Sequence, residues 1–401
     1  MRLLAFAAPL LAACSVAAIA QTVSDDPYVW LEEKDSARSL AWVEAHNAVT
    51  VKRLEADARY ATLYDEALAL ASAKDRIPMP RFLGGEIYNF WQDADHLRGI
   101  WRKTTLADYR TAAPKWQTVL DIDALGKAEG KSWVFKGANC LLPDETRCLI
   151  SLSDGGEDAT EVREFDLVTG KFVEGGFVLP RAKSDVTWED RDHLLVSTEW
   201  TPGDLTESGY PYIVKRLTRG QPLASAVEIY RGEKKDVAAA PAVFHDGQGH
   251  TLPIIQRALD FFHNETFVVT PAGTRRVAMP GKVSVAELVA GRVILKLDED
   301  WADAGPQFKA GSVAEVDLAA LLAHPDKLSP RLVWSPNPRT ALDGVSSTKG
   351  RLLLGTLDNV RGRVLALTPI RGWDGRPARS SCPTTFRSTW AAATSALNGC
   401  S

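Results

Sequence analysis

The sequence lacks several motifs by which whole classes of protein are recognised. It contains no C-x-x-C pair and no H-E-x-x-H motif, so the common zinc-site patterns are absent. It contains no G-x-S-x-G pentapeptide, the nucleophile elbow of α/β-hydrolases. It has no long basic stretch, and its formal net charge is −4, which gives nucleic-acid binding no support. We therefore predict no catalytic, cofactor-binding or metal-binding residues in this chain.

Two polar loops come closest to a metal site, and both fall short. His245, Asp246 and His250 lie in a glycine-containing stretch, where a solvated loop is the better interpretation. A second loop holds three acidic residues around a Gly-Gly pair, namely Asp154, Glu157 and Asp158. The EF-hand spacing is missing there, so we interpret this loop as a hairpin turn with a polar rim.

Long apolar runs are confined to the N-terminus. Residues 3–13 are apolar behind Arg2, too short to span a bilayer, and residues 18–20 (Ala-Ile-Ala) are typical of a signal cleavage site. Residues 11–14 also resemble a bacterial lipobox, in which Cys14 would be lipidated. We predict a signal peptide over residues 1–20 and a periplasmic or secreted protein, free or lipid-anchored, with no transmembrane span.

Cysteine is scarce, with five residues in the chain. Cys140 and Cys148 flank a short loop, and an exported protein meets oxidising conditions, so these two are candidates for a disulfide across a hairpin. Two free thiols are the alternative. Cys382 and Cys400 lie near the C-terminus.

What the sequence does contain is a repeated β pattern. In residues 147–197, short β-branched and aromatic runs alternate with Gly/Asp turns, which predicts antiparallel strands joined by hairpins. Similar units begin near Ile87, Leu149, Leu194, Leu252, Val293 and Leu352. Their spacing of about 40 to 60 residues is typical of four-stranded propeller blades. We predict a mainly β fold with a β-propeller of about six blades over residues 76–370. A large sandwich or several small β domains is the alternative.

The regions on either side have a different character. Residues 25–75 show helical spacing, with Leu40, Val43 and Asn47 on one face, and predict two helices that need something to pack against. Residues 371–401 lose strand periodicity and are rich in Ala, Ser and Thr. This composition indicates a disordered or out-of-frame tail.

Several short motifs carry a resemblance to a known family. They are DPYVWLE at 26–32, AWVEAHN at 41–47, GIWRKTT at 99–105, SLSDGG at 151–156, VREFDL at 162–167 and SGYP at 208–211. In this order they resemble the prolyl oligopeptidase family of serine peptidases, over about residues 25–370. The resemblance implies a seven-bladed propeller that filters oligopeptide substrates above an α/β-hydrolase domain. That domain would carry a Ser-Asp-His triad and cleave peptides containing proline.

The chain departs from this family pattern in two ways. The repeat supplies six units instead of seven, and neither the nucleophile elbow nor a βαβ alternation follows the strands. We therefore expect a truncated family member without its catalytic domain, inactive alone, whose propeller meets oligopeptide substrate only in the full-length enzyme. The alternative is a stand-alone exported propeller that binds a peptide, a glycan or a protein.

Overall fold

The computed structural model describes residues 26–369. Contacts between residues divide the chain into two compact units, with the boundary between Ser72 and Ala73. The predictions for the signal peptide, for Cys14 and for the C-terminal tail with Cys382 and Cys400 lie outside the described residues.

The first unit is helical. It contains η1 (Val29–Glu32), α1 (Ala37–Glu55) and α2 (Tyr60–Ala71). The Ser36 side chain begins α1 by accepting a hydrogen bond from the Ser39 amide at 3.2 Å, as an N-cap residue does. The predicted helical segment is confirmed. Among residues 26–369, no helix is long and apolar enough to cross a membrane.

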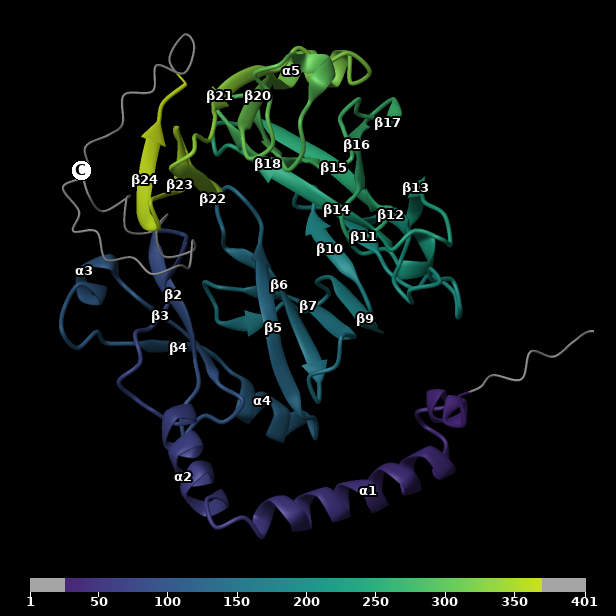
Figure 1. Cartoon of the computed structure of the whole chain (residues 1–401), viewed down its shortest axis with the longest axis vertical. Coiled ribbons are helices and arrows are strands. Elements are labelled where there is room, and N and C mark those ends of the chain that lie inside the picture. Colours follow the sequence, from purple (N-terminus) through teal and green to yellow (C-terminus); the bar gives the residue numbers. More distant parts are fainter. Residues whose placement is uncertain (1–25, 370–401) are drawn as a thin grey trace, which may run out of the picture. The chain divides into compact units, whose positions relative to one another are not determined.

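The second unit consists of antiparallel sheets in sequence order (Figure 1). Sheet A holds β1 (Arg81–Leu83), β2 (Glu86–Trp91), β3 (Ile100–Thr104) and β4 (Gln117–Asp121). Sheet B holds β5 (Trp133–Cys140), β6 (Arg147–Asp154), β7 (Thr160–Asp166), β8 (Lys171–Phe172) and β9 (Val178–Ala182). Sheet C holds β10 (Asp185–Trp188), β11 (His193–Ser197), β12 (Ile213–Thr218) and β13 (Val227–Arg231).

Three more sheets complete the described part of this unit. Sheet D holds β14 (Ala238–His245), β15 (Thr251–Ala258), β16 (Asn264–Thr270) and β17 (Gly273–Arg276). Sheet E holds β18 (Val283–Val289), β19 (Arg292–Leu297), β20 (Val313–Asp317) and β21 (Arg331–Trp334). Sheet F holds β22 (Thr340–Thr348), β23 (Arg351–Asp358) and β24 (Arg361–Leu367). The connections carry α3 (Leu106–Tyr109), α4 (Ile122–Glu129), α5 (Leu318–Ala323), η2 (Leu223–Ser225) and η3 (Ala302–Ala304).

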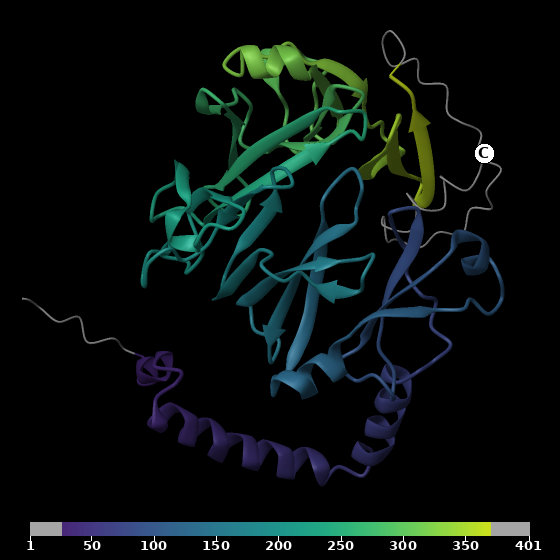
Figure 2. The same ribbon diagram turned by 180° about the vertical axis from the view of Figure 1, so that it is seen from behind.

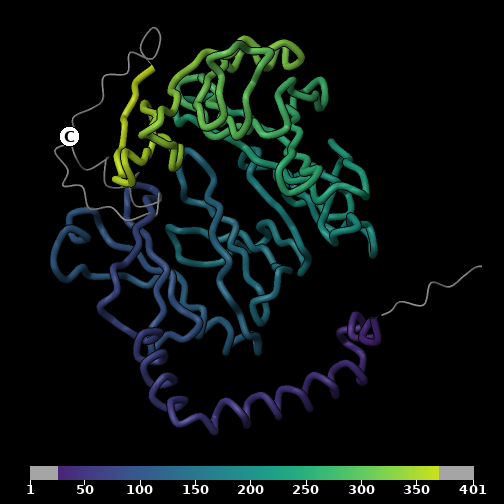
Figure 3. Tube along the Cα trace, viewed as in Figure 1, coloured from purple at the N-terminus to yellow at the C-terminus, as the bar shows by residue number. Residues whose placement is uncertain are grey.

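The sheets follow one another around a common centre, as the ribbon from behind and the tube along the chain both show (Figures 2 and 3). The first strand of one sheet contacts the first strand of the next, as β10 does β14, β14 does β18 and β18 does β22. This is the arrangement of a β-propeller. The predicted fold class is confirmed: a mainly β chain with a six-bladed propeller over the described residues, preceded by a helical segment.

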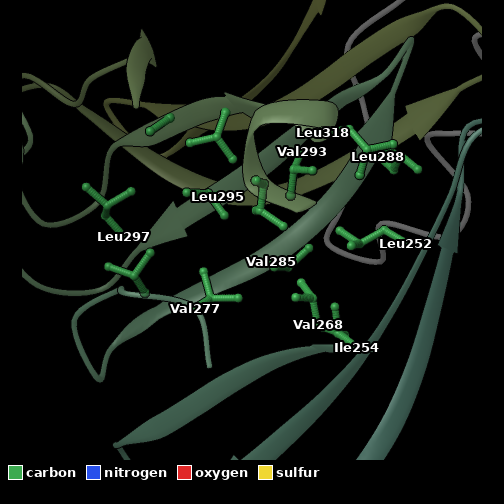
Figure 4. Close-up of a cluster of buried hydrophobic side chains, with 14 of the residues drawn as sticks. Leu252, Ile254, Val268, Val277, Val285, Leu288, Val293, Leu295, Leu297 and Leu318 are labelled. Carbon is green, nitrogen blue, oxygen red and sulfur yellow. The ribbon is translucent and has the colours of Figure 1, made fainter. Parts of the chain in front are cut away.

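The core of the propeller lies between neighbouring sheets. In the largest cluster, Leu252 and Ile254 of sheet D face Val285, Leu288 and Leu295 of sheet E (Figure 4). Four further clusters join A to B, B to C, C to D and E to F. Each sheet from B to E is therefore covered on both faces, mainly by its neighbouring sheets, with Ile122 of α4 and Leu318 of α5 adding to two of the clusters.

The predicted repeat begins one strand late in each blade. Within residues 147–197, β6 to β9 belong to sheet B, while β10 and β11 begin sheet C. The predicted unit starts mark second strands instead, since Ile87, Leu194 and Val293 lie in β2, β11 and β19. A second strand lies inside its sheet, and in sheets B to E it is covered on both faces, which explains why it has the most continuous apolar run.

Candidate functional site

The first strands of the blades carry the polar groups nearest the centre of the propeller. On β5, the Asn139 amide nitrogen donates to the Val186 carbonyl of β10 at 3.2 Å. The Trp188 indole nitrogen of β10 donates back to the Asn139 carbonyl at 2.9 Å. This reciprocal pair connects sheets B and C through side chains where no backbone ladder joins them.

Among the acids on the first strands of the blades, Glu287 has the largest pKa shift. It lies on β18 next to a β-bulge between Val285 and Glu287, and its carboxylate accepts a hydrogen bond from the Ser347 hydroxyl of β22 at 2.9 Å. Burial raises the pKa of Glu287 to about 7, against the lowering effect of that hydrogen bond. A carboxyl group with such a pKa can hold or release its proton near neutral pH.

Two other ionisable groups occupy inner strands. Burial raises the pKa of Asp185 on β10, although the residue remains accessible to water. Burial also lowers the pKa of His245 on β14, and the neighbouring Asp246 carboxylate opposes this shift. Together with Glu287, these groups can form hydrogen bonds on the first strands, and their charge depends on pH.

The described histidines that contact acids do so in local turns. His250 Nδ1 lies 2.6 Å from Asp246, and Asp246 also accepts from the Gly291 amide at 3.0 Å, which ties the β14–β15 turn to the β18–β19 turn. Three similar contacts join a histidine to the aspartate three residues before it, in the pairs Asp93–His96, Asp190–His193 and Asp260–His263. Within residues 26–369, no serine hydroxyl is bonded to any of these rings, so these pairs do not form a triad.

Two of the three acids in the loop around Gly155 pair with basic side chains from outside the loop. Asp154 accepts from Lys131 Nζ at 2.9 Å and from the Ser132 amide at 3.0 Å, while Glu157 pairs with Arg181. These cations neutralise the carboxylates that a calcium ion would otherwise need. In the part of the chain that the structure describes, no group of three or more His, Cys, Asp or Glu residues is placed to hold a metal ion.

A disulfide joins Cys140 to Cys148. The two residues are directly opposite in the β5–β6 ladder, with their Cα atoms 3.9 Å apart, and both are buried in the core between sheets A and B. The bond therefore closes the loop that precedes β6 and holds the base of this hairpin together.

Two surface pockets were missed by sequence reasoning. One, of about 400 Å³, lies on the outer strands of sheet E beside α5 and is lined by Arg292, Asp317, His324 and Lys327 among others. The other, of about 490 Å³, lies along α4 and includes Arg98. The residues of each pocket come from separate stretches of the chain, so no local sequence motif indicates the pocket.

The fold and inner strands define a β-propeller protein, and comparison with known proteins narrows the class. Residues 13–299 match the family model described as the prolyl oligopeptidase N-terminal β-propeller domain. The chain belongs to the prolyl oligopeptidase family, in the region of its N-terminal propeller, which confirms the resemblance stated above.

Similar proteins agree with this assignment. An uncharacterized peptidase of Sinorhizobium fredii, y4nA, is 45% identical over 349 residues, which cover 85% of this chain and 48% of that protein. An uncharacterized peptidase of Rickettsia prowazekii, RP174, is 26% identical over 353 residues, covering 84% of this chain and 49% of that protein. The chain thus spans about half the length of the curated relatives it matches.

Solved structures show the same partial coverage. A post-proline cleaving enzyme from Rickettsia typhi matches with a TM-score of 0.81 and 26% identity, covering 87% of this chain and 52% of that chain. Oligopeptidase B from Leishmania major matches with a TM-score of 0.61 and 13% identity, covering 86% of this chain and 46% of that chain, which supports the fold alone.

Proposed function

We propose that this chain is the propeller region of an exported serine peptidase that hydrolyses oligopeptides containing proline. In this proposal the propeller restricts which peptides reach a catalytic domain, and the 401-residue polypeptide by itself does not hydrolyse peptides. The observation that carries the proposal is the match to a post-proline cleaving enzyme at a TM-score of 0.81, over 52% of that enzyme.

The inactivity of this polypeptide is supported by its sequence and by its described residues. No G-x-S-x-G pentapeptide occurs anywhere in the chain. Every strand pair within residues 26–369 is antiparallel, whereas an α/β-hydrolase is built on a mostly parallel sheet. The polar groups of the inner strands would then contact a passing peptide and perform no chemistry on it.

Export to the periplasm or medium is supported by two independent features. The N-terminal sequence has the pattern of a signal peptide with a lipobox ending at Cys14. The Cys140–Cys148 disulfide is of a kind that persists in oxidising compartments and is rare in the reducing cytosol. Cell fractionation with and without the Cys14→Ala change, combined with labelling by a palmitate analogue, would test export and lipid attachment separately.

The functional test has two arms. The purified chain should neither hydrolyse a chromogenic peptide with proline before the chromophore nor react with a serine-directed phosphonate probe. A chimera of residues 26–369 with the unmatched remainder of the Sinorhizobium protein should do both, if the native Sinorhizobium protein does so under the same conditions.

The phosphonate probe makes each outcome of this test decisive. Turnover by the 401-residue chain, with one labelled serine, would contradict the proposed inactivity. A chimera that reacts with the probe but fails to cleave the peptide, beside an active native protein, would contradict the proposed role of this propeller. In that case a stand-alone propeller that binds a partner becomes the better interpretation.

A further inference from the structure

The pocket of about 400 Å³ beside α5, here called the α5 pocket, belongs to a blade whose two neighbouring blades are both present. Its lining residues lie between Arg292 of β19 and Arg331 of β21, and they include part of α5 and of the loop that follows it (Figure 1). Sheet E packs against sheet D through one apolar cluster and against sheet F through another. Sheets A and F, which end the row of described sheets, contribute no residue to the lining.

The α5 pocket lies at one end of sheet E. Arg292 begins β19, Asp317 ends β20 and Arg331 begins β21. Because consecutive strands of this sheet are antiparallel, these three positions lie together at the end of the blade opposite the start of its first strand, β18. No residue of β18 lines the pocket, so it is separate from Glu287 and the other polar groups on the first strands.

One arginine pairs with both acids of the α5 pocket. Arg292 Nε lies 3.9 Å from a Glu315 carboxylate oxygen, and Arg292 Nη1 lies 3.4 Å from an Asp317 carboxylate oxygen. Glu315 is only 2% exposed, and a buried carboxylate needs such a cation beside it. Asp317 also accepts a hydrogen bond from the Ala320 amide at 3.0 Å, as the N-cap residue of α5. Both carboxylates are therefore held by groups of the blade itself.

Two further cations line the α5 pocket without a carboxylate partner. Lys327 and Arg331 are exposed, and neither forms an ion pair with a described residue. The acid nearest to them in the chain, Asp326, is not part of the lining and pairs with Arg275 at 3.2 Å. Three cationic and two acidic side chains thus line the pocket, and its net formal charge is +1 with His324 neutral.

The rest of the lining is largely apolar. Val316 and Leu321 are buried members of the cluster between sheets D and E, and Leu328 packs against that cluster. The α5 pocket therefore combines exposed cations with apolar side chains that continue into the core. Its volume of about 400 Å³ lies in the range of pockets that hold small organic molecules, which bind through apolar contacts and a few placed polar groups.

We propose that the α5 pocket binds a small organic carboxylate. The carboxylate accepts hydrogen bonds from Lys327 and Arg331, and the apolar part of the ligand packs against Leu321 and Leu328. A monoanion matches the net charge of +1, and the planar guanidinium of an arginine is suited to a carboxylate. A small inorganic anion would leave the apolar lining uncovered. This inference goes beyond the proposed function, because the pocket has no residue on the first strands and its test requires no peptidase activity.

Two matched fluorinated probes test the proposal, 4-(4-fluorophenyl)butanoate and the corresponding primary amide. Fluorine NMR titration of the 401-residue chain should show the carboxylate binding at least about tenfold more tightly than the amide, because only the carboxylate forms charge-assisted hydrogen bonds. Lys327→Gln and Arg331→Gln should each weaken carboxylate binding by about three- to tenfold. Arg331→Lys should recover part of this loss, since lysine keeps the charge and loses the planar fork.

A further variant separates the α5 pocket from general charge effects. Ala320 is exposed and lines the pocket, so Ala320→Trp should fill the pocket and abolish carboxylate binding without changing any charge. Lys349→Gln is the matched control, because Lys349 in the β22–β23 turn is exposed, forms no ion pair with a described residue and does not line the pocket. Its carboxylate binding should equal that of the wild type.

Near-ultraviolet circular dichroism of each variant checks that the fold is retained. Lys327 and Arg331 are exposed, so their variants test the proposal even if Ala320→Trp does not fold. Equal binding of the two probes, or no binding of either, would overturn the proposal. Unchanged binding in both Lys327→Gln and Arg331→Gln, or an equal loss in Lys349→Gln, would also overturn it. The proposed peptidase role does not depend on any of these outcomes.

Discussion

The sheets of the propeller and the helices that precede them place their apolar side chains differently. Leu252, Ile254 and Leu295 are fully buried between sheets D and E. In the helical unit, Leu40 is 50% exposed and Leu63 is 58% exposed, and no residue of α2 is buried. Both regions contain leucine at regular spacing, so the difference in burial comes from the surfaces against which these leucines can pack.

Geometry explains this difference. A sheet in a propeller packs each face against another sheet of the same kind, so every added blade buries the face of the one before it. An amphipathic helix has one apolar stripe and needs a separate surface to cover it. The stability of the propeller should therefore come from the apolar clusters between its sheets, whereas the helical unit should contribute little to that stability. The following experiments test this contrast.

The largest loss of stability is expected from a cavity in an apolar cluster between two sheets. Leu295→Ala removes a fully buried side chain from the core between sheets D and E, and should lower the free energy of unfolding by about 3 kcal/mol. Urea unfolding followed by tryptophan fluorescence measures it, and Leu297→Ala in the same cluster serves as a second reading. A loss below about 1 kcal/mol at both positions would show that the apolar clusters between sheets are not the main source of stability.

The disulfide should contribute the next largest amount. Replacing Cys140 and Cys148 together by alanine opens a loop of sequence separation 8, which should cost about 2 kcal/mol of unfolding free energy. Urea unfolding with and without a thiol reductant is the measurement. Reductant should lower the stability of the wild type and leave the double variant unchanged, and any other pattern would contradict the stabilising role of this bond.

Glu287 tests whether a charged carboxylate between sheets E and F lowers the stability. Its pKa of about 7 in the folded state exceeds that of an unfolded glutamate, so the folded state binds the proton more tightly. The wild type should therefore lose stability as the pH rises from about 5 to about 8, while Glu287→Gln should not. The two proteins should be equally stable at pH 4 and differ by the order of 1 to 2 kcal/mol at pH 8.

Urea unfolding of both proteins across this pH range is the measurement for Glu287. Ser347→Ala is a useful companion, because the Ser347 hydroxyl donates to this carboxylate and its loss should steepen the pH dependence. A wild type and a Glu287→Gln variant with parallel pH profiles would mean that the carboxylate is well solvated.

The smallest effect is expected in the helical unit. Leu63→Ser places a polar group at an exposed position of α2 and should change the free energy of unfolding of the propeller by less than about 0.5 kcal/mol. The measurement is the same urea titration used for Leu295→Ala. A loss comparable to that of Leu295→Ala would mean that this face of α2 is covered in solution, and the contrast between the two regions would fail.

The sequence predicted those strands whose burial is complete on both faces. Residues 194–196 in β11 and residues 293–295 in β19 are fully buried and form continuous apolar runs, which are visible without a structure. The first strands β14 and β22 were not predicted, because they mix alanine, serine, proline and aspartate along the centre of the propeller. Such a mixed composition gives a weak periodic signal.

The same distinction applies to the functional groups. Cys140 and Cys148 were candidates because they are eight residues apart on one hairpin. Glu287 and Ser347 are 60 residues apart, and their contact depends on how two blades pack. Arg102 and the two tryptophans on which it stacks, Trp91 and Trp116, likewise come from separate strands and loops, so their stacking has no local signature.

By itself, the sequence determined the local properties of this protein: the helices, the hairpin repeat, the lack of a nucleophile elbow and the family motifs. Each depends on residues close together in the chain, where propensity and spacing are sufficient. Only the tertiary structure decided which faces meet, which carboxyl group has a pKa near neutral and which tryptophans stack on Arg102. These depend on contacts between blades, because burial and charge pairing arise only when distant segments pack together.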